Sequence, residues 1–104
     1  MTAPRAAPGE TMDERFLAVL VALVEGEVVS YGDVAEDAGH PGRSRAVGRL
    51  LATADVDVPW WRVVRSDGTI ATEPPATQAA LLRAEGVVVR GRRVVESPGG
   101  RFRP

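Results

Sequence analysis

Apolar residues recur at helical spacing in the first quarter of the chain and predict a helix over residues 12–25. Thr11 and Glu14 have the Thr-x-x-Glu form of a capping box, which marks a helix start. Gly26 is a typical stop. Because apolar side chains surround much of this helix, we expect it to be the central helix of the core.

Two further helices are predicted after a short extended link at residues 28–30. The first covers residues 31–38, with Ser30 as its N-cap. The glycine- and proline-containing stretch 39–42 then forms a tight turn, and a third helix runs over about 43–54. Helix, short helix, turn and helix in this order outline a helix-turn-helix.

The segment after the third helix predicts a β-hairpin. Residues 59–64 favour a strand, Arg65-Ser-Asp-Gly68 a turn, and residues 69–71 the returning strand. A hairpin at this place would form the wing of a winged helix-turn-helix.

A fourth helix over 77–85, with Leu81 and Leu82 facing inward, precedes a last hairpin of residues 87–89 and 93–95. The fold class expected is mainly α with a small β part: a single winged helix-turn-helix domain over residues 11–96. Residues 1–10 and 97–104 are expected to be a flexible N-terminus and a flexible C-terminal tail.

The two sides of the third helix differ sharply at 100° per residue. One side carries the apolar Val47, Leu50 and Leu51. The other carries Arg45, Gly48, Arg49 and Ala52. Small residues between arginines allow close approach to a ligand, so this face favours nucleic-acid contact over an ordinary solvated surface.

Charge is unevenly distributed along the chain. Residues 1–42 hold two arginines and eight acids, whereas residues 43–104 hold eleven arginines and six acids, and there is no lysine. A basic half suggests a polyanion partner, although a chance segregation in a chain that uses only arginine explains the charges equally well.

The composition removes several kinds of chemistry. With no cysteine there is no disulfide, thiolate metal site or thiol nucleophile, and the single His40 cannot build a histidine metal site. No apolar run approaches the length of a membrane span, and no signal peptide is visible. We expect a cytoplasmic monomer without cofactor, metal or membrane partner, associated with the nucleoid when bound to DNA.

The adjacent Trp60 and Trp61 follow Pro59 in a chain with five aromatic residues. In an extended strand they would point to opposite sides. Either both fill the core, which is the commoner case, or one forms an aromatic wall on which a base stacks.

Five motifs in one order carry a family resemblance over residues 11–96. They are Val-Ser-Tyr-Gly-Asp-Val-Ala (29–35), Ser-Arg-Ala-Val-Gly (44–48), Val-Pro-Trp-Trp-Arg-Val-Val (58–64), Asp-Gly (67–68) and Leu-Leu-Arg-Ala-Glu-Gly (81–86). This sequence resembles the C-terminal, DNA-binding domain of the O6-alkylguanine-DNA alkyltransferases.

The active motif of that family is Pro-Cys-His-Arg-Val, where this chain has Trp60 for the cysteine and Trp61 for the histidine. The replacement is similar to that of the alkyltransferase-like proteins. That resemblance implies a non-enzymatic sensor that binds O6-alkylguanine in double-stranded DNA by flipping the nucleotide and passes the lesion to nucleotide excision repair proteins.

The resemblance also implies roles for individual residues. The third helix would enter the minor groove, with Arg45 as the finger that takes the place of the flipped nucleotide. The implied DNA-binding residues are Tyr31, Arg43, Ser44, Arg45, Ala46, Gly48 and Arg49. The implied lesion pocket consists of Tyr31, Trp60, Trp61, Arg62, Val63 and Glu85.

Two features depart from the family pattern. Glu85 matches the glutamate that pairs with the missing histidine, which leaves it to accept from the indole of Trp61 or to hold Arg62. The loop expected to line the pocket contains Glu73, Pro74 and Pro75, so the family does not explain how guanine would be discriminated here.

Other functions stay open at this stage. A sequence-specific winged-helix transcriptional regulator usually reads bases with Asn, Gln, Arg or Lys and binds as a dimer, but the third helix has no Asn or Gln. A protein-interaction domain without a DNA role is disfavoured by the basic helix face. Hydrolysis with His40 or Glu85 as base is disfavoured because no motif supplies either with a partner.

Overall fold

The computed structural model describes residues 10–53, 55 and 57–104. The chain divides into two compact units. The helical unit contains the described residues of Met1–Leu23 and Tyr31–Trp60, and the sheet unit contains Val24–Ser30 and Trp61–Pro104. The expected flexibility of residues 1–9 lies outside the described residues.

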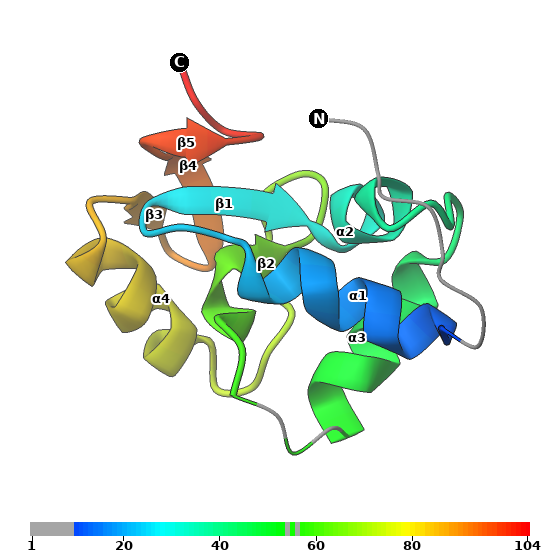
Figure 1. Ribbon diagram of the computed structural model, residues 1–104. Helices are drawn as coiled ribbons and strands as arrows, with labels where there is room; N and C mark the ends of the chain where they lie inside the picture. Colours follow the sequence, from blue (N-terminus) through cyan, green and yellow to red (C-terminus); the bar gives the residue numbers. More distant parts are fainter. Residues whose placement is uncertain (1–9, 54, 56) are drawn as a thin grey trace. The chain divides into compact units, whose positions relative to one another are not determined.

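The helical unit consists of α1 (Met12–Val21), α2 (Tyr31–Asp37) and α3 (Ser44–Thr53), which pack against one another (Figure 1). Its buried core includes Phe16, Leu20, Val34, Ala35 and Val47. The helices lie within one or two residues of the predicted second and third helices, so the helix-turn-helix is confirmed.

The first helix is shorter than predicted. Its capping box forms, since the Thr11 hydroxyl accepts from the Glu14 main-chain N–H at 3.1 Å. After Val21, however, successive amides bond three residues back, and the helix ends four residues before Glu25. Val21 and Val24 are consequently exposed, so the prediction of a helix buried on most sides is wrong.

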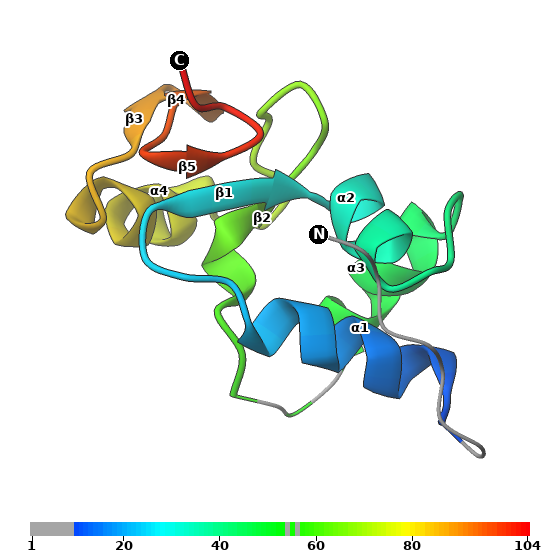
Figure 2. The same ribbon diagram turned by 45° about the horizontal axis from the view of Figure 1, so that its top comes forward.

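The sheet unit contains a three-stranded parallel sheet of order β2-β1-β5. Figure 2 shows β1 (Glu27–Ser30) next to β5 (Gly99–Gly100), and β2 (Val63–Val64) pairs with the other edge of β1. The predicted extended link at residues 28–30 is therefore the central strand of this sheet.

The remaining strands, β3 (Val88–Arg90) and β4 (Arg93–Glu96), form the predicted last hairpin. Helix α4 (Pro75–Ala84) packs against β3. None of the helices in the described part of the chain is long and apolar enough to cross a membrane.

The predicted wing hairpin of residues 59–64 and 69–71 does not form. Trp60–Arg62 is instead a 3-10 turn, η1, and the following strand pairs in parallel with β1. Val63 and Val64 are both fully buried, which suits a covered parallel strand better than a solvated wing. Thr69 pairs with Arg93 of the last hairpin.

Residues 97–104 are not the free tail that the sequence predicts. Ser97 is buried, Phe102 packs on the core of the sheet unit, and the Arg101 amide donates to the Val28 carbonyl at 2.9 Å. Gly100 lies so close to β1 that a Cβ atom there would collide with the Val28 main chain. The folded domain therefore extends beyond residue 96.

The core of the sheet unit also contains a buried polar side chain, Gln78, that sequence analysis missed. Leu82 is fully buried as predicted, but Leu81 is 37% exposed. Gln78, one helical turn before Leu82, is fully buried. Its amide donates to the carbonyls of Trp61 and Val63 at 3.0 and 2.9 Å, and its oxygen accepts from the Thr72 hydroxyl at 2.7 Å. Gln78 therefore fixes the path of the chain through η1 and β2.

We expect Gln78→Leu to destabilise the protein although leucine is more apolar. The substitution removes the amide donor that binds the carbonyls of Trp61 and Val63, and a buried group left unsatisfied costs about 1–3 kcal/mol. Urea unfolding would measure the loss, with Ala80→Leu on the exposed side of α4 as the control. An unfolding midpoint for Gln78→Leu equal to that of Ala80→Leu would contradict this role.

Candidate nucleic-acid interface

The N-terminal part of α3 presents a basic face. Arg43, Ser44, Arg45 and Arg49 are exposed, and no acidic residue occurs over residues 38–54. Within the described residues, the side chains of these three arginines make no hydrogen bond or ion pair with the protein. Their guanidinium groups are therefore available to an external anion.

Gly48 lies on the same face of α3 and leaves it without a side chain at that position. A methyl group on Gly48 would meet no neighbouring atom within 4 Å in the described structure, and its backbone is ordinary α-helix. Glycine in a helix interior costs about 1 kcal/mol relative to alanine. Internal packing does not require this glycine, so the bare surface points to something outside the chain that approaches α3 closely.

Residues of α1 hold the turn before α3 in place. The buried Arg15 of α1 donates from Nε to the Ala38 carbonyl at 2.6 Å, at the end of α2. Gly39 follows with φ +83°, and a Cβ there would lie 3.0 Å from the Arg15 guanidinium. The His40 ring meets Phe16 edge-on at 6.1 Å between ring centroids.

These contacts give Arg15 and His40 structural roles in positioning α3. Sequence analysis missed Arg15, although an arginine directly before the core residue Phe16 on a largely apolar helix was a visible signal. His40 was weighed as a possible base, and its contact with Phe16 gives it a packing role instead.

Tyr31 and Trp60 also belong to the helical unit. Tyr31 is the first residue of α2 and Trp60 the first residue of η1, and both side chains are partly exposed. The Trp60 amide donates to the Val58 carbonyl at 2.7 Å, which closes the turn that follows Pro59. The bend replaces the predicted extended strand, so the argument that the two tryptophans alternate across a strand does not apply.

Glu85 is the centre of a hydrogen-bond cluster in the sheet unit. One carboxylate oxygen accepts from the Gly26 amide at 2.8 Å and from Arg62 Nε at 2.9 Å. The other accepts from Trp61 Nε1 at 2.7 Å and from Arg62 Nη2 at 2.8 Å. Of the two partners left open by the sequence, Trp61 and Arg62, Glu85 therefore binds both.

The hydrogen bonds around Glu85 give Trp61 a structural role. Its indole N–H is used by Glu85, its ring packs against the core of the sheet unit, and the Arg62 guanidinium carbon lies 5.2 Å from the ring centroid. A guanidinium at this distance gains cation–π energy. Of the tryptophan pair, Trp60 is thus the better candidate for ligand contact.

The other candidate pocket residues contribute main chain or surface contacts. Val63 is fully buried, so its side chain belongs to the core. In the pocket loop, Arg92 binds Glu73 at 2.6 Å, and Pro74 and Pro75 begin α4. The implied DNA-binding residues thus lie together in the helical unit, whereas Trp61, Arg62, Val63 and Glu85 lie in the sheet unit.

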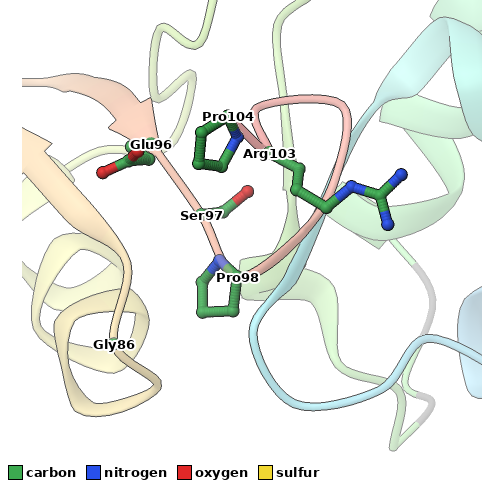
Figure 3. A pocket seen from close by; sticks show the side chains of 6 residues that line it. All are labelled: Gly86, Glu96, Ser97, Pro98, Arg103 and Pro104. Carbon is green, nitrogen blue, oxygen red and sulfur yellow. The ribbon is translucent and has the colours of Figure 1, made fainter.

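A separate pocket of about 430 Å³ lies near the C-terminal segment, and Figure 3 shows the side chains around it. Its lining residues are Gly86, Glu96, Ser97, Pro98, Arg103 and Pro104. None of them is a predicted site residue. The described residues contain no cluster of three or more His, Cys, Asp or Glu side chains that would suit a metal ion.

The surroundings of Glu85 determine its protonation. Burial by itself raises the pKa, because the side chain is only 9% exposed, but the hydrogen bonds from Arg62, Gly26 and Trp61 outweigh it and lower the pKa to about 2. Glu85 is therefore ionised at neutral pH. A carboxylate with four hydrogen-bond donors and so low a pKa is a weak base.

We expect Glu85 to make the stability of the protein sensitive to acid. The unfolded chain binds a proton at Glu85 near pH 4.5 and the folded chain only near pH 2, so this stabilisation is complete above pH 4.5 and is lost as the pH falls to 2. The difference corresponds to on the order of 3 kcal/mol.

Urea unfolding between pH 7 and pH 2.5 would measure it. Glu85→Gln should be less stable than the parent at pH 7 and lose less stability on acidification, whereas the exposed Glu36→Gln control should follow the parent. Parallel pH profiles for the parent and Glu85→Gln would exclude this contribution.

Comparison with known proteins places these features in a family. The family described as "6-O-methylguanine DNA methyltransferase, DNA binding domain" matches residues 11–87. The Escherichia coli (strain K12) DNA base-flipping protein is 40% identical over 86 residues, which cover 79% of this chain and 67% of that protein. Alkyltransferase-like protein 1 of Schizosaccharomyces pombe is 38% identical over 87 residues, covering 75% of this chain and 81% of the relative.

A solved structure shows the same fold. S. pombe Atl1 in complex with damaged DNA containing O6-carboxymethylguanine superposes with a TM-score of 0.69 at 28% sequence identity, covering 76% of this chain and 79% of that one. The family resemblance is thereby confirmed, and so is the fold class of a small, mainly α domain with small sheets, although the hairpin predicted as its wing does not form over residues 59–71. This chain belongs to the family of the DNA-binding domain of 6-O-methylguanine-DNA methyltransferases.

Proposed function

We propose that this protein is a non-enzymatic sensor of DNA alkylation, which binds O6-alkylguanine in double-stranded DNA by flipping the modified nucleotide. The observation that carries the proposal is the face of α3, where arginines without a partner among the described residues flank a glycine that internal packing does not require. The base-flipping name of one relative and the damaged DNA bound to Atl1 support the same ligand.

Binding begins with α3 in the minor groove. Gly48 allows the helix to come close, while Arg43, Ser44 and Arg49 contact the phosphate backbone. Ala46, which the sequence placed among the DNA-binding residues, is buried within the helical unit and leaves the close approach to Gly48. Arg45 enters the base stack and takes the place of the flipped nucleotide, and Tyr31 contacts that nucleotide's phosphate. Flipping costs a few kcal/mol, less for a damaged base, and the planar guanidinium recovers stacking and hydrogen bonds.

The flipped base would enter a pocket that has no acceptor for its alkyl group. Removal of an alkyl group by transfer requires a strong nucleophile such as a thiolate, and the chain contains no cysteine. Trp60 stands where the family has its cysteine and offers an apolar wall to the alkyl group. Glu85 is held ionised by hydrogen bonds from Trp61 and Arg62, which makes it a weak base toward water.

Because no reaction ends the complex, the protein would stay on the lesion. A monomer that persists on flipped, distorted DNA is a marker that nucleotide excision repair proteins can recognise. The sensor function therefore consists of binding and persistence.

A titration with two duplexes that differ by one methyl group tests the proposal. We expect tighter binding to the duplex with O6-methylguanine than to the guanine duplex, and binding to both that weakens with salt. Equal affinity for the two duplexes would overturn the sensor function and favour a DNA-binding regulator.

Arg45→Ala should remove most of the lesion preference, because the vacated stack stays unfilled. A stacking contribution of about 1–3 kcal/mol corresponds to roughly a 5- to 150-fold loss of affinity for the methylated duplex. Fluorescence anisotropy with both duplexes measures it. Arg43→Ala is the matched control, since loss of a phosphate contact should weaken binding to both duplexes alike; an unchanged preference in Arg45→Ala would contradict the finger role.

Gly48→Ala should move stability and affinity in opposite directions. Alanine in the middle of α3 should raise the free energy of unfolding by about 0.5–1 kcal/mol. The added methyl group should weaken binding to both duplexes, because it separates the helix from the groove. Thermal unfolding and anisotropy give the two values. A variant that is more stable and binds as tightly as the parent would show that α3 does not approach DNA at this position.

A further inference from the structure

The outer face of the β3–β4 hairpin has an arrangement of arginines that the fold does not explain. Arg90 and Arg93 are exposed, whereas the neighbouring Val89 and Val94 are buried. The register places these two residues directly opposite each other. Like charges in a cross-strand pair destabilise a hairpin, and the nearby Asp67, 4.0 Å from Arg93, offsets the charge of only one member of this pair.

Two arginines of this hairpin are held in place yet remain exposed. Arg93 donates from Nε to the Asp67 carbonyl at 2.8 Å, and its side chain is 62% exposed. Arg92 donates from Nε to the Ile70 carbonyl at 3.2 Å and pairs with Glu73, and its side chain is 46% exposed. The rotamer entropy that a free arginine loses on binding is thus already largely lost in the folded protein.

The third arginine of the hairpin is Arg90. Within the described residues, its side chain makes no hydrogen bond or ion pair. Gly91, at the tip of the hairpin, has no atom within 4 Å of the position of a Cβ. The tip is therefore bare, as Gly48 of α3 is, and a large ligand can approach it closely.

The charges around the hairpin remain positive when its neighbours are counted. Arg65 lies exposed in the adjoining turn with Asp67, and Glu73 pairs with Arg92. Asp67 lies 4.0 Å from Arg93, and Glu96 is exposed at the far end of β4. The two acids nearest the tip thus face four arginines.

We propose that the tip of the β3–β4 hairpin, formed by Arg90, Gly91, Arg92 and Arg93, is a second contact surface for the phosphate backbone of DNA. It is separate from α3 and reads no base. Guanidinium forks suit phosphate oxygens, and phosphate contacts add affinity that does not depend on sequence or damage. The identity of the polyanion as DNA rests on the proposed function.

The salt dependence of DNA binding tests this surface through Arg90→Gln. Each phosphate contact contributes about 0.9 to the slope of log K against log salt concentration. Between 50 and 200 mM salt, the parent should therefore lose about three- to fourfold more affinity than Arg90→Gln. The loss at low salt should be equal for the guanine and O6-methylguanine duplexes.

Two controls separate this effect from loss of the fold or of charge in general. Arg103→Gln removes the same charge from an exposed residue outside the hairpin and should leave the slope unchanged. The melting temperature of Arg90→Gln should equal or exceed that of the parent, because the like-charge pair with Arg93 is removed.

The outcomes distinguish this proposal from the sensor function. A lesion preference with an unchanged slope in Arg90→Gln would overturn the hairpin surface alone. A reduced slope in a protein without lesion preference would support the hairpin surface and overturn the sensor function. Absence of DNA binding by the parent would overturn both.

Discussion

The sheet unit depends on the carboxylate of Glu85. Its four hydrogen bonds join three parts of the chain that are far apart in sequence: the turn before β1, the η1 turn and the end of α4. An isolated carboxylate in so closed a position would be costly. Here all four donors bind the ionised carboxylate. The carboxylate therefore holds in place η1, the turn that contains Trp60 and Trp61. Gln78 holds the same turn from the other direction through two carbonyls.

The same cluster bears on the proposed non-enzymatic function. The family glutamate pairs with a histidine, and here Trp61 still offers a ring N–H to the same carboxylate. An indole donates but does not accept a proton, so the hydrogen bond survives while proton transfer does not. Under the proposed function, this indole and the absence of cysteine suit a protein that holds a base without modifying it.

Sequence analysis predicted the elements that depend on local signals. The capping box at Thr11, the helix-turn-helix and the last hairpin follow from periodicity and turn residues, and all three are present. The wing failed because the backbone carbonyls of Trp61 and Val63 bind Gln78, a long-range contact that no local pattern reveals. The segment after Ser97 was misjudged for a similar reason, since Gly100 is required by close packing against Val28.

The positions where the chain breaks local rules without internal benefit are informative about binding. Gly48 weakens a helix without an internal contact that requires it, and the Arg90–Arg93 pair weakens a hairpin in which only Arg93 has a nearby acid, Asp67, among the described residues. By contrast, Gly26 and Gly39, with positive φ and close neighbours, serve the fold itself. Locally unfavourable residues that the fold does not use are expected at functional sites. Both exceptions here are bare or basic surfaces, which an extended polyanion would stabilise by close approach and by neutralising charge.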